Sequence, residues 1–275
     1  MIEEWLSAWS LFAASWVSAW LLAPLLGIVG VAVVARGAIF QGVATAQAST
    51  AAVAAMLVLA QSVAWCGTPW AIATASLVVA ITASIIATTG RSSEAANGWL
   101  FLAAGAAVPL LLVHSPHGLA EIQHLVTSSL IGATWWDATV FGGLLAGVML
   151  ALVVAGSRVR LVLLDREVAA ELGLHVARWQ IVIGLTVGMV IGLGLRVAGL
   201  LFVAGSLVLP TLAAARLVRT TAAMAWCAPL LALLTVVVGT ALAHSGDLPQ
   251  GQVVVALQAV LVVLVFTMRS ISNRS

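Results

Sequence analysis

Four polar side chains stand out because they occur inside long apolar runs. Thr45, Gln47 and Ser49 lie in the stretch ARGAIFQGVATAQAST (residues 35–50), and Ser206 lies in a later run. Their hydroxyl and amide groups can exchange hydrogen bonds with a solute or offer it oxygen ligands. Since a polar group in apolar surroundings is costly, we predict that these four side chains line a polar pathway.

A second interpretation stays open for the long amides of Gln47 and Gln258. Either side chain could bond to a neighbouring helix instead of facing a pathway. A single serine or threonine can also bond to the backbone of its own helix.

His244 and Asp247, in the string HSGDLP, are a candidate metal-binding pair. Imidazole and carboxylate are ligands that zinc and manganese accept. The alternative is a solvated loop in which Asp247 caps the next helix. His114, His117 and His124 lack metal-type spacing, and we interpret them as residues of a solvated loop.

The composition shows what surrounds these polar groups. The chain has 275 residues, of which 63% are hydrophobic and only 7% are charged, with a mean hydropathy of +1.19. A soluble domain commonly has about a quarter of its residues charged. The apolar runs are continuous rather than alternating, so they predict helices and not the strands of a barrel. We therefore expect an all-α, multi-pass integral membrane protein with one transmembrane domain, residues 1–275.

Eight or nine segments are long and apolar enough to cross a membrane. The piece around 197–210 could be a broken helix instead of a full crossing. The expected spans are 15–35, 43–63, 70–89, 98–113, 138–156, 179–195, 199–218, 222–243 and 252–268.

Arginine gives the orientation, because basic residues favour the cytoplasmic side. If Arg36 lies inside, all the other arginines except Arg196 also fall inside, and the C-terminus is cytoplasmic. We expect Arg196 to reach toward the outer interface. The expected location is the plasma (inner) membrane, and the absence of lysine with abundant alanine and arginine is typical of a GC-rich bacterial genome.

Two local patterns predict how helices begin, end and pack. In the inner segment, Asp165 can cap a helix and Gly173 suits its end. Glycines recur at close-packing spacing, and they let helices approach each other in lipid. They are Gly143 and Gly147, and then Gly184, Gly188 and Gly192.

The sequence excludes two kinds of catalytic site. It contains no lysine and no GxxxxGK[ST] string, so it has no P-loop for a nucleotide. It also has no HExxH motif for an intramembrane metalloenzyme. We expect no enzyme activity in this chain, and any ATP hydrolysis would belong to a separate subunit.

Three strings resemble the permeases of metal-importing ABC transporters of the zinc, manganese and iron type, the ABC-3 type. LLDREVAAELGLHVARW resembles the cytoplasmic Phe-Asp-Pro-Glu-x-Ala loop of that family. AGLLFVAGSLVLPTLAAARLV resembles its Gly-x-Leu-Leu-Val…Pro-Ala-Ala segment, and AHSGDLPQGQVVV its Asp-Leu-Pro-x-Gly segment. The strings occur in the family's order, and the resemblance covers essentially the whole chain.

This resemblance implies a permease of the type II ABC importer kind. Its partners would be two ATP-binding subunits, an extracellular solute-binding protein and a second permease, identical or related; no nucleic acid is expected. A short cytoplasmic helix in residues 215–226 would couple the permease to the ATPase through Arg216 and Arg219. Those two arginines could equally be positive-inside anchors.

The substrate implied is a divalent cation such as zinc or manganese, or a metal-bearing compound, with no tightly bound cofactor. The chain departs from the family where that family carries Gly-Asp-x-x-x-His-Ala, because Val43 and Gln47 replace the Asp and His. Valine cannot bind a metal, and glutamine offers only an amide oxygen. A stand-alone secondary transporter or channel is the alternative, although the spans have almost no titratable residues to couple protons.

Overall fold

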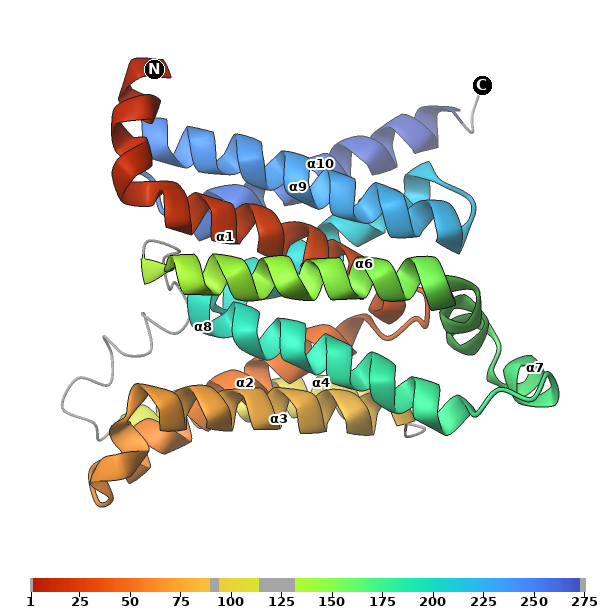
Figure 1. The fold of residues 1–275 in the computed structure, drawn as a ribbon, viewed down its shortest axis with the longest axis horizontal. Coiled ribbons are helices and arrows are strands. Elements are labelled where there is room, and N and C mark those ends of the chain that lie inside the picture. The colour runs from red at the N-terminus through yellow and green to blue at the C-terminus, as the bar shows by residue number, and fades with distance from the viewer. Residues whose placement is uncertain (1, 90–93, 114–131, 273–275) are drawn as a thin grey trace.

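The computed structural model describes residues 2–89, 94–113 and 132–272, and within these ranges the regular structure is entirely helical. Figure 1 shows long helices lying side by side along one axis. The elements are α1 (Ile2–Val34), α2 (Ile39–Leu59), η1 (Ala64–Gly67), α3 (Pro69–Thr89), α4 (Glu94–Leu112), α6 (Trp135–Leu164), α7 (Arg166–Glu171), α8 (Val176–Leu217), α9 (Thr221–Ser245) and α10 (Gln250–Ser272).

Eight helices in the described ranges are long and apolar enough to cross a membrane, which confirms the all-α membrane fold. The longest, α8, is two helices joined at Gly199, whose φ of 77° and ψ of 170° are not helical. A side chain would strain that backbone conformation, so glycine suits this position. The two parts, 176–198 and 200–217, account for both spans predicted on either side of this point.

Reversal at Gly199 returns both ends of α8 to the same end of the molecule (Figure 1). This end also carries Arg36 after α1, Arg158 near the end of α6 and Arg269 in the last turn of α10. We call it the inner end, and we call the opposite end, where Arg196 lies, the outer end. The predicted separation of the arginines is therefore present in the fold; Arg91 and Arg274 lie outside the described residues.

Helices α1 and α8 form the centre of the bundle. Trp16, Leu22 and Leu26 of α1 and Phe202 and Leu207 of α8 are almost completely buried. Most of these residues belong to one cluster of apolar side chains, which also includes residues of α6, α9 and α10. The bundle therefore surrounds α1 and α8 and leaves much of α6 exposed.

Glycines allow α8 to pack against α3 at backbone distance. A Cβ built on Gly188 would lie 2.4 Å from Ile81 Cα and 2.7 Å from Ala80 O, and Gly184 and Gly192 face the same helix. The glycines of α6 behave differently, because nothing lies within 4 Å of a Cβ built on Gly143 or Gly147. The predicted packing role is confirmed for the α8 glycines and is wrong, within this chain, for the α6 pair.

Two boundaries differ from those predicted. Helix α6 is longer than the expected span 138–156, because Thr134 caps it earlier and Asp165 ends it later. The short helix expected within residues 215–226 is absent: α8 continues to Leu217 and α9 begins at Thr221, capped by Thr220. The short helix at the inner end is α7, which is capped by Asp165 and followed by Gly173 at φ 78°, as their residue types predict.

Gly188→Ala should lower the free energy of unfolding by about 1–3 kcal/mol, because the added methyl group overlaps the α3 backbone. Gly143→Ala is the matched control. It should leave stability unchanged or raise it slightly, since alanine favours a helix and the site is open. Thermal unfolding of the two variants in the same detergent measures the difference, and equal midpoints would contradict the close α3–α8 contact.

Candidate functional site

The three pathway candidates of α2 do not share one face of the helix. At about 100° per residue, Thr45 and Ser49 lie on the same side and Gln47 lies on the opposite side. Ser49 Oγ donates to Ser76 O of α3 at 2.8 Å and lies 2.8 Å from Ser76 Oγ. The Gln47 side chain lies against Gly105 of α4. The three side chains therefore do not lie on one face of α2, and the pathway role of each stays a prediction.

Ser206 belongs to a buried hydrogen-bonding cluster of three helices. Gln258 of α10 donates through Nε2 to Ser206 Oγ of α8 at 3.1 Å and to Thr235 Oγ1 of α9 at 3.3 Å. Ser206 and Gln258 have no exposed surface. The open question about Gln258 is thus answered in favour of bonding between helices. The pathway role of Ser206 stays a prediction, but its visible contacts hold helices together.

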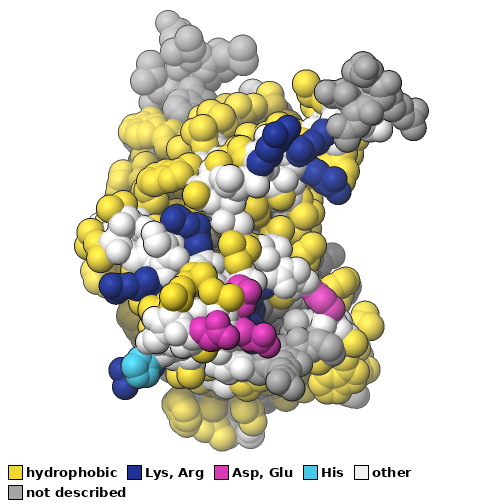
Figure 2. Space-filling model, turned by 90° about the vertical axis from the view of Figure 1, so that its right-hand side faces the viewer, with side chains coloured by type: hydrophobic (Ala, Val, Ile, Leu, Met, Phe, Trp, Pro, Cys, Tyr) yellow, Lys and Arg dark blue, Asp and Glu magenta, His cyan; other side chains and the backbone are white. Residues whose placement is uncertain are grey.

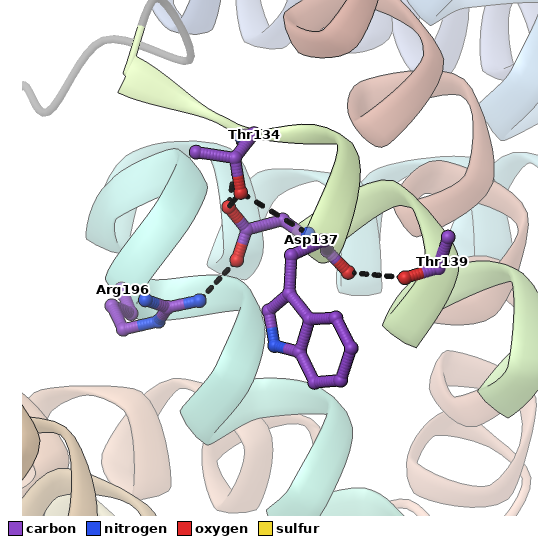
Figure 3. A network of polar contacts seen from close by, with 5 residues as sticks. Thr134, Asp137, Thr139 and Arg196 are labelled. Atoms are coloured by element: carbon purple, nitrogen blue, oxygen red, sulfur yellow. Dashed lines mark hydrogen bonds and ion pairs between the residues drawn. The ribbon is translucent and has the colours of Figure 1, made fainter.

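An ion pair joins α6 to α8 at the outer end (Figure 3). Arg196 donates through Nη2 to Asp137 Oδ1, while Asp137 Oδ2 accepts from Thr134 N at 2.9 Å and from Thr134 Oγ1 at 2.7 Å. The Asp137 side chain is 6% exposed and that of Arg196 is 48% exposed. Arg196 therefore binds a carboxylate on another helix, which the sequence-based expectation of an interfacial arginine did not include.

This arrangement fixes the start of α6 beside the reversal of α8. The Thr134 hydroxyl caps the helix by accepting from Asp137 N, at 3.4 Å. Asp137 thus serves both as the third residue of a capping box and as the acid of an ion pair. Arg196 precedes Gly199 by three positions, so the ion pair links α6 directly to the segment where the chain turns back.

His244 and Asp247, the candidate metal-binding pair, lie in different surroundings. The His244 ring lies 5.9 Å from the ring of Phe12 and 5.5 Å from that of Trp16, between centroids. Asp247 is exposed, in a left-handed conformation at φ 50°. In the described ranges no three His, Cys, Asp or Glu side chains come together to hold a metal ion. A two-ligand site stays a prediction, and His114, His117 and His124 lie outside the described residues.

Polar contacts at the inner end anchor α7 to the bundle. Arg166 donates two hydrogen bonds to the side-chain amide oxygen of Gln180, from Nε at 3.0 Å and from Nη1 at 3.2 Å. The Gln180 amide is oriented with its oxygen toward Arg166, as these two bonds require. Arg166 Nη2 also approaches Thr88 O of α3 at 3.5 Å. The first residue of α7 is therefore held by α3 and α8 together.

Arg36, in the connection between α1 and α2, lies near this anchor. It donates through Nη2 to Gln41 Oε1. Burial, together with the positive charge of Arg166, lowers the pKa of Arg36 from its ordinary value to about 10. The guanidinium still carries its charge near neutral pH, so two cations face each other at the base of α7.

The predicted coupling residues lie at the inner end, Arg216 in the last turn of α8 and Arg219 between α8 and α9. The Arg216 guanidinium carbon lies 4.5 Å from the centre of the Phe266 ring of α10, a cation–π contact. Arg219 is exposed. Their role in coupling stays a prediction, and the contact of Arg216 also agrees with an anchor at the interface.

Sequence reasoning missed the Asp137–Arg196 pair and the Arg166–Gln180 anchor. The first had a signal, because Asp137 follows Thr134 by three residues and Arg196 is the lone outer arginine. The Arg166–Gln180 contact had no sequence signal, except that Gln180 occurs near the start of an apolar run.

Arg196→Gln should lower the free energy of unfolding by about 1–3 kcal/mol, because it leaves the buried Asp137 carboxylate without its cation. Adding Asp137→Asn to this variant should restore part of the loss. A double-mutant cycle of thermal unfolding measures the coupling, and additive effects of the two substitutions would show that the pair contributes nothing.

Comparison with known proteins gives a consistent result. The sequence matches the family described as "ABC 3 transport family" over residues 9–269. No match is found among curated proteins.

Two solved structures share the fold. PsaBC from Streptococcus pneumoniae, in complex with Fab, has a TM-score of 0.77 at 17% identity, over 97% of this chain and 95% of that one. An inward-facing conformation of a metal-chelate type ABC transporter has a TM-score of 0.75 at 16% identity, over 94% and 88%.

Proposed function

Because this chain belongs to the ABC 3 transport family, we propose that it is the permease subunit of an ATP-driven importer in the inner membrane of a bacterium. The observation that carries the proposal is the family match along nearly the whole sequence, together with α7, a short helix that the fold holds at the inner end of the bundle. ATP hydrolysis belongs to a separate subunit, since the chain has no P-loop.

We place the ATPase contact on α7 and the residue that follows it. Leu172 is 68% exposed and Val168 is 39% exposed, while Arg166 fixes the base of the helix. Figure 2 shows acidic and apolar side chains together on this face of the molecule. An exposed apolar group on a firmly held helix suits a contact that transmits movement from another subunit.

The transport pathway is proposed to form between two permease chains. In the described part of one chain, Ser49, Ser206 and Gln258 all have hydrogen-bond partners on neighbouring helices. A second, identical or related chain facing this one would complete a pathway that one bundle does not enclose. An extracellular solute-binding protein would deliver the substrate at the outer end.

The substrate we propose is a divalent metal ion, zinc or manganese, or a compound that carries one. One of the two similar structures is described as a metal-chelate type ABC transporter, and this description supports metal-related transport by this fold. Val43 and Gln47 offer the ion no carboxylate or imidazole in α2. Any binding along that helix would thus be weak, which agrees with a transported rather than a resident ion.

Leu172→Asp should reduce co-purification with the cognate ATPase by about tenfold or more, because a charge would enter an apolar contact. Leu248→Asp is the matched control, as Leu248 is an exposed leucine (54%) at the outer end. Pull-down from membranes that express both subunits provides the measurement.

If the unmodified chain binds no ATPase, the importer proposal fails and a stand-alone transporter becomes the better description. If Leu172→Asp binds the ATPase as well as the control does, only the assignment of α7 fails.

Gln47→Leu tests one pathway candidate of α2. If Gln47 faces the transported ion, the variant should lose metal uptake while membrane insertion and assembly stay intact. Uptake of a radioactive metal into cells, with the protein level in membranes as control, gives the answer. Unchanged uptake would assign Gln47 to packing against Gly105.

A further inference from the structure

An apolar groove and a basic pocket adjoin each other at the inner end. The groove, which we call the inner groove, runs between α1 (28–35), α6 (148–164), α8 (179–187) and the start of α9 (221–225). The adjoining arginine pocket is lined by Arg158, His175 and Arg178 with Gly173 and Leu174. Trp179 and Val182 line both, so the two spaces are direct neighbours.

The inner groove lies at the depth of one membrane leaflet. All four helices contribute the halves nearest the inner end, and the lining is apolar apart from Arg160, Thr186 and Thr221. Along α6 it extends over sixteen residue steps, about 24 Å. The hydrocarbon of one leaflet is about 15 Å thick, so an acyl chain would fit along the groove.

Within the described ranges, the arginine side chains around the pocket have few hydrogen-bonding or ion-pair partners. In the part of the chain that the structure describes, neither the Arg158 nor the Arg178 side chain has a hydrogen-bonding or ion-pair partner, and the Arg160 side chain is bonded only to Ser157 Oγ at 3.3 Å. Among the described residues, no acidic side chain lines either space. The pocket has a volume of about 350 Å³, far more than the space that one water molecule needs. It can therefore hold a phosphate group.

We propose that the inner groove and the arginine pocket together bind one anionic phospholipid of the inner leaflet. The acyl chain occupies the groove, and the headgroup phosphate accepts hydrogen bonds from Arg158 and Arg178, with the charge of Arg160 in the adjoining groove lining. Arginine forks match phosphate oxygens in pairs, and basic pockets between membrane helices on the cytoplasmic side are typical sites for anionic lipids. The positive charges of the arginines suit an anionic phospholipid. The proposal requires only that the chain lies in a membrane, and it does not depend on what the chain transports.

Native mass spectrometry of the purified full chain, titrated with phosphatidylglycerol or phosphatidylcholine, tests this site. The unmodified chain should bind phosphatidylglycerol more tightly than phosphatidylcholine. Arg158→Gln, Arg160→Gln and Arg178→Gln together should weaken that binding on the order of 100-fold, from the contribution of three basic residues near an anionic lipid. The charge-matched control removes three other arginines of the inner end, through Arg216→Gln, Arg219→Gln and Arg269→Gln. This control variant should still bind phosphatidylglycerol.

Two further variants separate a lipid from free phosphate. Ala32→Phe and Ala151→Phe each place a ring in the groove and leave every arginine in place. Either should weaken phosphatidylglycerol binding but not stabilisation by inorganic phosphate, measured by thermal unfolding, which also shows whether each variant folds.

Equal binding of the two lipids, or unchanged phosphatidylglycerol binding by the triple arginine variant, would overturn the proposal. So would groove variants that keep the lipid but lose the second permease or the ATPase, because the groove would then be a protein interface.

Discussion

Hydrocarbon cannot form hydrogen bonds, and this constraint accounts for the inter-helix contacts of Ser49 and Gln258 in the bundle. A polar side chain within a span must find its partner on its own or a neighbouring helix. Ser49 finds Ser76, and Gln258 finds Ser206 and Thr235. These bonds join neighbouring helices: α2 to α3, and α10 to both α8 and α9. The polar residues therefore serve assembly first, and a pathway must be sought where the bundle meets another chain.

The reversal at Gly199 gives α8 its central place. One helix that crossed once would have taken the chain to the outer end before α9, with Arg216 and Arg219 on the wrong side. By turning back, α8 presents its first half to α3 through Gly188 and its second half to α10 through Ser206. The Asp137–Arg196 pair ties α6 beside the turn. Outer and inner ends are thus linked through one helix whose direction changes at a single residue.

The inner end combines a fixed element with open surfaces. Arg166 secures α7 against α3 and α8, so a force applied to α7 would reach two central helices. Around that anchor lie arginines with few partners inside the chain. An ATPase on α7 and an anionic lipid beside it would occupy adjacent surfaces, and each would satisfy charges or apolar groups that the chain alone leaves exposed.

The sequence by itself determined the helical membrane fold, a count of eight or nine spans, the end that carries the arginines and the permease family. These follow from hydropathy, from the positions of Arg36 and Arg216, and from strings that stay together along the chain. The helix cap at Asp165 and the helix end at Gly173 were also predicted from the sequence, because each depends on only a few neighbouring residues. The tertiary structure alone decided that Gln47 and Ser49 face different helices, that Gln258 bonds to Ser206, and that Arg196 finds Asp137. Such pairings depend on how helices far apart in sequence rotate and approach each other, and apolar residues all round each helix leave no pattern from which that rotation could be predicted.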